Sequence, residues 1–204
     1  VITRSIKIGM TRDTLEIRVL QEMHCLNMLR KYIDGASSYL DVGANIGMNS
    51  LAAHFVFNRN IPIVMIEPSI DCHPALESIE RILPNLSLMK LAIGDDNCEA
   101  EFNRSLSSAT SQASSMLQFS STYKGAQDHA NAPIVKDKVR VIKLDILESL
   151  MGYDLGQNII MHIDVEGFEY QTLLGAKAML DRVKIITLEA SRSLFVNQKS
   201  FDDI

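Results

Sequence analysis

Short apolar segments alternate with segments of helical periodicity along most of the chain. Five apolar runs are predicted to be strands: SSYLDVG (37–43), IPIVMIE (61–67), LSLMKLAIGD (86–95), NIIMHID (158–164) and KIITLEA (184–190). Such alternation is typical of a parallel sheet whose two faces are covered by helices. The pattern therefore predicts an α/β fold with a mostly parallel, doubly wound sheet.

The same pattern predicts three helices in the first half of the chain. A leading helix ends at Asp34-Gly35, a second follows the first strand, and a third follows the second strand and ends at Pro84. Each has an apolar stripe at helical spacing. The stripes consist of Val19, Met23, Leu26, Leu29 and Ile33, then Met48, Leu51, Ala52 and Phe55, then Leu76, Ile79, Ile82 and Leu83.

Residues 99–145 depart from this alternation and are predicted to be an insertion. AEFNRSL (100–106) and VRVIKLDIL (139–147) have the composition of strands, and they bracket a serine-rich stretch. Serine and threonine favour turns over regular structure. We therefore expect a strand-loop-strand insertion with a mobile loop from about Asn103 to Lys124.

Composition and charge indicate one globular domain. The chain has 204 residues, of which 47% are hydrophobic and 22% are charged, and a chain of this length needs no metal or disulfide to stabilise its core. The net charge is −5 and the lysines and arginines are scattered, so nucleic acid is not expected as a partner. No apolar run is long enough to span a bilayer, and no membrane association is expected.

The cysteines are predicted to be reduced and structural. Cys25, Cys72 and Cys98 are far apart and form no CxxC pair, and His73 beside Cys72 has no second pair to complete a zinc site. We expect a cytoplasmic protein without a bound metal.

The stretch YLDVGANIG, residues 39–47, interrupts a strand with an acid, two glycines and an asparagine. Ligands of open parallel sheets bind beyond the carboxyl ends of the strands, where the first strand turns into its helix. A dinucleotide-binding turn has the spacing G-x-G-x-x-G, but Asn45 replaces its second glycine, and Asp41 would repel a pyrophosphate. Asp41 would instead suit the ammonium and sulfonium of S-adenosylmethionine, with Gly43 and Ala44 along the methionine moiety. Simple chain reversal is the alternative interpretation of this turn.

A second acid strengthens the prediction of an adenosine-containing ligand. Glu67 ends the next strand, 26 residues after Asp41, and a carboxylate at about this spacing accepts the ribose hydroxyls in dinucleotide-binding folds. Taken alone, Glu67 would be a solvated strand end, and Gly94-Asp95 a plain turn. The predicted cofactor site comprises Asp41, Gly43, Ala44, Asn45, Gly47, Glu67, Pro68, Ala92 and Asp95.

The chain resembles the FkbM-type methyltransferases, S-adenosylmethionine-dependent enzymes with the Rossmann-like class I fold. The resemblance runs from about Tyr39 to Ser191, through DVGANIG, IEPS, LAIGD, VIKLDIL, IDVEGFE with LLGA, and ITLEAS. IDVEGFE (163–169) followed by LLGA (173–176) is its most specific part. The resemblance implies an O-methyltransferase acting on a hydroxyl of a sugar or another hydroxylated small molecule.

Two features of the chain depart from the family pattern. The family usually has lysine where His162 stands, and this chain stops soon after the fifth strand, without a closing hairpin. The short tail is expected to reflect a fragment, a partly ordered chain, or a sheet edge completed by a partner such as a second copy.

One methyltransferase domain is expected over residues 1–204. Its expected parts are a leading helical segment (1–37), a cofactor-binding half (38–95), the insertion (99–145) and an acceptor half (146–204) that is incomplete at its C-terminus. An insertion after the cofactor-binding half is placed to cover the cleft, so the serine-rich loop is predicted to be a lid over the acceptor site. A passive surface loop is the alternative, and the sequence does not favour one over the other.

Three carboxylates are the candidate catalytic groups. Asp164 ends the fourth strand at the cofactor edge and is the candidate base, while Glu166 would brace the turn or the acceptor and Glu189 could assist from the fifth strand. Each could instead cap the helix that follows it. The three could also gather around Mg²⁺, which ranks below simple base catalysis because no ligand spacing demands a metal.

Two other classes of function stay open from the sequence. A non-catalytic protein that binds a nucleoside or S-adenosylmethionine would share the fold and the cofactor site. A nicotinamide-dependent oxidoreductase is a weaker alternative, because Asp41 and Asn45 do not suit a phosphate-binding turn.

Overall fold

The computed structural model describes residues 20–27, 34–57, 61–106, 114–118, 133–188 and 196–199. Its main sheet has five strands, all parallel, in the order β3-β2-β1-β7-β8. They are β1 (Ser38–Val42), β2 (Ile63–Ile66), β3 (Leu86–Met89), β7 (Ile159–Ile163) and β8 (Val183–Leu188). The strand order reverses at β1, which is where open α/β sheets bind their ligands. The predicted α/β fold, Rossmann-like with a doubly wound sheet, is confirmed.

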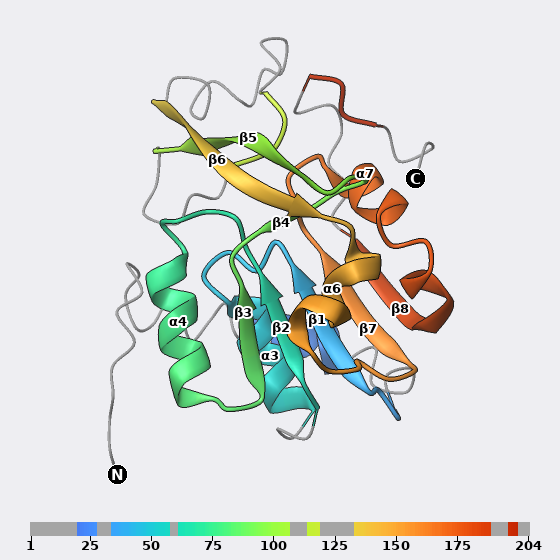
Figure 1. The fold of residues 1–204 in the computed structure, drawn as a ribbon. Coiled ribbons are helices and arrows are strands. Elements are labelled where there is room, and N and C mark those ends of the chain that lie inside the picture. The colour runs from blue at the N-terminus through green and yellow to red at the C-terminus, as the bar shows by residue number, and fades with distance from the viewer. Residues whose placement is uncertain are drawn as a thin grey trace.

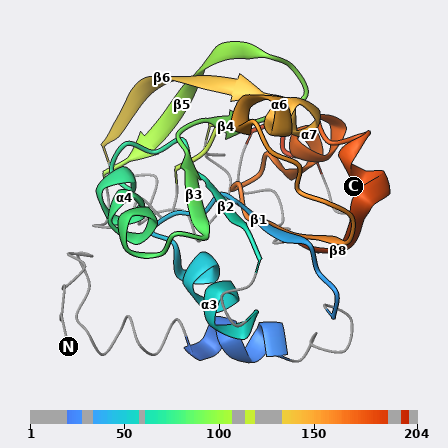
Figure 2. The ribbon, with the colours of Figure 1, turned by 60° about the horizontal axis from the view of Figure 1, so that its bottom comes forward.

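Helices cover both faces of this sheet (Figures 1 and 2). One face packs against α3 and α4, and the other packs against a group of shorter helices that follow the insertion. The helices are α3 (Met48–Val56), α4 (His73–Ile82), η2 (Leu144–Ile146), α6 (Leu147–Met151), α7 (Glu169–Leu174) and η3 (Met179–Arg182). Residues 20–27 are also helical, and Leu26 joins the α3 face of the core.

The central strand, β1, shows why the apolar runs of the sequence lie in the interior of the protein. All five residues of β1 are buried, because helices lie on both faces. Successive side chains point to opposite faces, so Tyr39 packs with the α3 cluster, while Leu40 and Val42 pack with the α6 cluster. Asp41 therefore lies fully inside the protein, on the α3 side.

The insertion, together with β4 (Ala92–Ile93) just before it, forms a second, smaller sheet. Its strands are β4, β5 (Cys98–Ser105) and β6 (Ile134–Ile142), in the order β4-β6-β5. β6 runs parallel to β4 and antiparallel to β5. This sheet lies across the carboxyl ends of the main strands (Figure 1), so it covers the edge at which a ligand is expected.

The strand prediction for residues 86–95 was wrong in one respect. The run is divided between two sheets, since β3 ends at Met89 and β4 begins at Ala92. The chain turns at Lys90, which is exposed, and Leu91 N–H donates to the Met89 carbonyl oxygen at 3.1 Å.

The strand predicted for residues 139–147 was displaced by about five residues, since β6 covers Ile134–Ile142. β6 ends at Ile142, and the next residues form helical turns, because Leu144 and Leu147 are fully buried against the main sheet.

Two residues that the helical periodicity predicted to face inward are exposed instead. Phe55 on α3 is 46% exposed and Ile82 on α4 is 37% exposed.

Parts of several predictions lie outside the described residues. These are residue 19 and residues 28–33 of the leading helix, residues 107–113 and 119–132 of the insertion, and residues 189–190 of the fifth strand. Within the described part, no helix is long and apolar enough to cross a membrane.

Candidate active site

A pocket lies between the carboxyl edge of the main sheet and the insertion. It contains about 590 Å³ of empty space, part of which opens to solvent. Seven of the predicted site residues line it: Gly43, Asn45, Glu67, Pro68, Ala92, Asp164 and Glu166. The fold therefore brings together residues more than 120 positions apart in the sequence, as predicted from the strand ends.

Gly43 ends the central strand and packs tightly against the loop after β7. Its φ is +88°, and a Cβ built there would lie 1.7 Å from the carbonyl oxygen of Asp164. The Gly43 and Ala44 amides both donate to the Ile66 carbonyl oxygen, at 2.9 and 3.0 Å. The glycine is thus required for contact between two loops of the site, a reason that the sequence did not reveal.

Glu67 is a buried acid at the end of β2. It is 6% exposed, and its two oxygens accept hydrogen bonds from the backbone N–H groups of Asn45 and Ser69, each at 2.8 Å. Burial raises its pKa to about 7, more strongly than these two bonds lower it. The remaining lone pairs of a carboxylate can accept further hydrogen bonds, so this side chain fits a ligand with two hydroxyl groups.

Asp41 does not line the pocket. It is fully buried, and its Oδ2 accepts a hydrogen bond from Ser50 Oγ, in the first turn of α3, at 2.5 Å. Burial raises its pKa, while His162 on the neighbouring strand and Ser50 lower it. The structure therefore places Asp41 beneath the turn, where it holds the start of α3, and not at the pocket wall.

His162 lies beside Asp41 in the strand pairing of β1 with β7. Its Nε2 is 2.9 Å from Asn49 Nδ2, and its Nδ1 is 2.9 Å from Thr187 Oγ1. Both ring nitrogens are thus engaged by protein groups, which ties α3, β7 and β8 together below the pocket.

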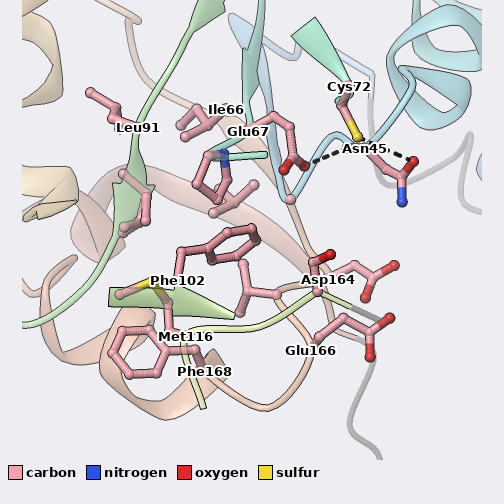
Figure 3. A pocket seen from close by; sticks show the side chains of 17 residues that line it. Asn45, Ile66, Glu67, Cys72, Leu91, Phe102, Met116, Asp164, Glu166 and Phe168 are labelled. Atoms are coloured by element: carbon pink, nitrogen blue, oxygen red, sulfur yellow. Dashed lines mark hydrogen bonds between the residues drawn. The ribbon is translucent and has the colours of Figure 1, made fainter. Parts of the chain in front are cut away.

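Asp164 and Glu166 reach the pocket from the loop after β7. Asp164 N–H donates to the Val42 carbonyl oxygen at 2.9 Å, which continues the pairing of β7 with β1. Glu166 has a φ of +52°, in the left-handed region that is uncommon for a non-glycine residue. Both side chains are half-buried, and in Figure 3 both extend to the same side as Asn45, away from Phe102, Met116 and Phe168.

The opposite side of the pocket is apolar (Figure 3). Leu91, Phe102, Met116 and Phe168 line it. Phe102 belongs to β5 and Met116 to the segment 114–118, so the insertion supplies part of the wall. The arrangement can take a ligand with one flat apolar end and one polar end that carries hydroxyl or cationic groups.

The remaining predicted residues lie away from the pocket wall. Ala44 is buried, Asp95 is exposed, and neither lines the cavity. A Cβ on Gly47 would lie 2.6 Å from the Cδ1 atom of Ile79, so Gly47 serves the packing of α4. Glu189 lies outside the described residues. Among the residues that the structure describes, no group of three histidine, cysteine or acidic side chains could hold a metal ion.

Sequence reasoning missed several pocket residues. Those not predicted include Cys72, Leu91, Phe102, Ser114, Met116 and Phe168. Two of them could have been recognised from the sequence. Phe168 belongs to the IDVEGFE stretch, and Met116 is an apolar residue in a serine-rich segment.

Comparison with known families agrees with the geometry. The model of the Methyltransferase FkbM domain matches residues 41–204, which is most of the chain and includes every described residue that lines the pocket. No curated protein and no solved structure matches the chain. The FkbM resemblance predicted from the motifs is confirmed, and a methyltransferase of this family implies a small-molecule acceptor. The chain belongs to the FkbM methyltransferase family.

Proposed function

We propose that the chain transfers a methyl group from S-adenosylmethionine to a hydroxyl of a sugar or another hydroxylated small molecule. The observation that carries this proposal is the position of three carboxylates in one pocket. Glu67 lies beside the glycine turn, and Asp164 and Glu166 enter from the loop across from it. One carboxylate can thus hold the nucleoside, while the other two lie where the methyl group and the acceptor would meet.

The residues present fit the nucleoside part of S-adenosylmethionine. Glu67 is fixed by the two backbone N–H groups and retains lone pairs for both ribose hydroxyls. The apolar wall with Leu91 and Phe102 suits a flat ring such as adenine. Asp95 is exposed, so no side chain is assigned to the amine of the ring.

The polar side of the pocket fits the other end of the cofactor. S-adenosylmethionine supplies an electrophilic methyl group on a positively charged sulfur. Asp164 and Glu166 provide negative charge near the turn that contains Gly43 and Asn45, which favours a cationic group over a phosphate. This interpretation replaces a direct contact with Asp41, which does not line the pocket.

Asp164 is assigned the role of general base. A sugar hydroxyl needs its proton removed as it attacks, and a placed base contributes typically about 10²–10⁴-fold to the rate. The backbone of Asp164 is held by β1, so the position of its carboxylate is set by the central sheet. Glu166 is assigned to the acceptor, whose hydroxyls its carboxylate can bind. Glu189 stays a predicted assisting group.

The test is transfer of a labelled methyl group from S-adenosylmethionine to a panel of sugars, glycosides and other polyols, with the product identified by mass spectrometry. The proposal predicts a methyl ether on at least one acceptor. Tight binding of S-adenosylmethionine without transfer to any member of the panel would favour a non-catalytic binding protein. Binding of NADH without binding of S-adenosylmethionine would favour an oxidoreductase.

A further inference from the structure

A short segment of the insertion, Ser114–Gln118, lies between the second sheet and the pocket. We call it the strap. Two of its residues, Ser114 and Met116, line the pocket, while Ser115 between them is only 1% exposed. The strap therefore presents alternate residues to the pocket and to the protein interior.

The strap is held on β5 by main-chain and side-chain hydrogen bonds. Asn103 N–H donates to the Ser115 carbonyl oxygen at 2.8 Å, and Ser115 N–H donates back at 3.0 Å. The side-chain Nδ2 of Asn103 donates to the Leu117 carbonyl oxygen at 3.1 Å. In addition, Ser105 N–H donates to Ser114 Oγ at 3.1 Å. The insertion therefore fixes the path of the strap.

The hydroxyl of Ser115 then joins the strap to the loop after β7. Ser115 Oγ donates to the Glu166 carbonyl oxygen at 2.6 Å and accepts a hydrogen bond from Leu117 N–H at 3.0 Å. It thus links the insertion to the residue whose carboxylate is assigned to the acceptor. The two residues are 51 positions apart in the sequence.

Glu166 is a residue whose conformation needs support. Its φ of +52° lies in the left-handed region, which is strained for a residue with a side chain. On its other side, the Gly167 N–H donates to Oε1 of Glu169, which is 2% exposed. The Glu166 peptide is thus held from the insertion and from α7, and this sets the direction of its side chain.

We propose that Ser115 is a positioning residue for methyl transfer. Through its hydroxyl, the insertion holds the main chain of Glu166 and so fixes the acceptor-binding carboxylate relative to the Met116 wall of the pocket. The inference rests on the proposed function, because it assumes that Glu166 meets the acceptor. It assigns to the insertion a part in shaping the acceptor site through residues that the structure describes.

Residue-resolved amide hydrogen exchange of the full chain tests this coupling. In Ser115→Ala, Gly167 N–H should exchange about fivefold faster, the factor that corresponds to one ordinary hydrogen bond, although Ser115 binds the Glu166 carbonyl oxygen of this peptide and Gly167 N–H donates to Glu169. Ser114→Ala is the matched control, because it removes a strap bond to Ser105 that does not involve the loop after β7. It should speed exchange at Ser105 and leave Gly167 unchanged. Faster exchange in the strap alone after Ser115→Ala would overturn the proposal.

Turnover with an acceptor identified from the panel separates positioning from general stability. Ser115→Ala should lower kcat several-fold while the affinity for S-adenosylhomocysteine stays within about twofold. Ser115→Thr retains the hydroxyl and should restore both kcat and the exchange rate of Gly167. Equal behaviour of the Ala and Thr variants would contradict the role of the hydroxyl. If the wild-type chain bound no S-adenosylhomocysteine while the exchange pattern appeared as predicted, the proposed function would fail and the contact between strap and loop would stand.

Discussion

Glu67 is buried at the pocket with a pKa of about 7, well above its ordinary value of 4.5. The folded chain consequently binds a proton at this site that the unfolded chain has released between these two pH values. The free energy of unfolding must then fall as the pH rises from about 4.5 to about 7, because the native state binds more protons. Asp41, whose pKa is also raised, acts in the same direction.

We predict that Glu67→Gln makes this pH dependence shallower. The contribution of Glu67 is on the order of 3 kcal/mol across the window, as a shift of one pKa unit corresponds to about 1.4 kcal/mol. Denaturant unfolding of the variant and of wild type at several pH values between 4.5 and 8 measures the difference. Parallel curves for the two proteins would contradict the burial of an ionisable Glu67.

The same residue should control the affinity for the cofactor. Only the ionised carboxylate accepts hydrogen bonds from both ribose hydroxyls, so binding of S-adenosylhomocysteine should tighten as the pH rises through 7. At pH 8, Glu67→Gln should bind at least about tenfold more weakly, since charge-assisted bonds contribute about 1.5–3 kcal/mol each. Calorimetry measures both effects. Glu77→Gln is the control, because Glu77 is exposed and pairs with Lys90 on the surface.

Asp164 is the residue on which the assignment of catalysis depends. Asp164→Asn keeps the size and most hydrogen bonds of the side chain but cannot take up a proton. We predict that kcat falls by about two to four orders of magnitude, while the affinity for S-adenosylhomocysteine, which lacks the positive charge on sulfur, stays nearly level. Asp181→Asn, at an exposed acid, should leave kcat unchanged. A folded Asp164→Asn variant with near-normal turnover would transfer the base role to another group.

At the scale of the elements, the site depends on how closely the turn after β1 meets the loop after β7. Gly43 has no Cβ, and the Asp164 carbonyl oxygen occupies the space where one would be. Any side chain at this position must push the loop that carries Asp164 and Glu166 away from the central strand. The glycine thus sets the distance between the turn after β1 and the loop after β7.

Gly43→Ala should therefore lower the free energy of unfolding by more than the left-handed backbone conformation alone explains. Gly152 provides the matched control, because its φ is +76° and a Cβ added there would meet nothing within 4 Å. Gly152→Ala should lower the free energy of unfolding by about 1–2 kcal/mol, the cost of the left-handed conformation. Gly43→Ala should lower it by at least about 2 kcal/mol more. Equal losses in the two variants, measured by denaturant unfolding, would show that the loops do not pack as described.

The elements could be predicted from the sequence where one local pattern decides the structure. The apolar runs of β1, β2 and β7 are buried on both faces, so they are recognisable without their neighbours. The division of residues 86–95 between two sheets was not predictable, because apolar periodicity shows that a strand exists and not which strand it pairs with. The helical turns after β6 were missed because Leu144 and Leu147 are apolar in either conformation.

At the scale of the whole molecule, Arg104 joins the insertion to the turn before α4. Its guanidinium contacts Asp137 on β6 and Asp71 in the turn before α4, at 2.5 and 2.8 Å, and its side chain is 14% exposed. Lys136 and Glu101 form an ion pair within the insertion, but their side chains are 52% and 63% exposed. Surface pairs of the latter kind contribute little to stability.

We predict that Arg104→Gln lowers the free energy of unfolding by about 1–2 kcal/mol, since it leaves two acids without their shared partner. Lys136→Gln should change it by less than about 0.5 kcal/mol. Denaturant unfolding of both variants provides the comparison. Similar effects in the two proteins would contradict a specific role of Arg104 in holding the insertion over the pocket.

The position of Glu67 and Asp164 at one edge was predictable, because the carboxyl ends of parallel strands share an edge. The contribution of Phe102 and Met116 was not, because their approach to the pocket depends on how a separate sheet lies across that edge. Asp41 is the opposite case, a residue that the sequence assigned to the pocket and that the structure places in the core. Its place next to the glycine turn suggested contact with a ligand, but alternation along β1 directs its side chain into the core.

The central claim is that the pocket binds S-adenosylmethionine with its ribose on Glu67. A crystal structure of the chain with S-adenosylhomocysteine tests it most directly. We predict that both ribose hydroxyls lie within hydrogen-bond distance of the Glu67 carboxylate, with adenine against the apolar wall and sulfur on the side of Asp164. A nucleoside bound outside this pocket, or bound in it with the ribose away from Glu67, would contradict the claim.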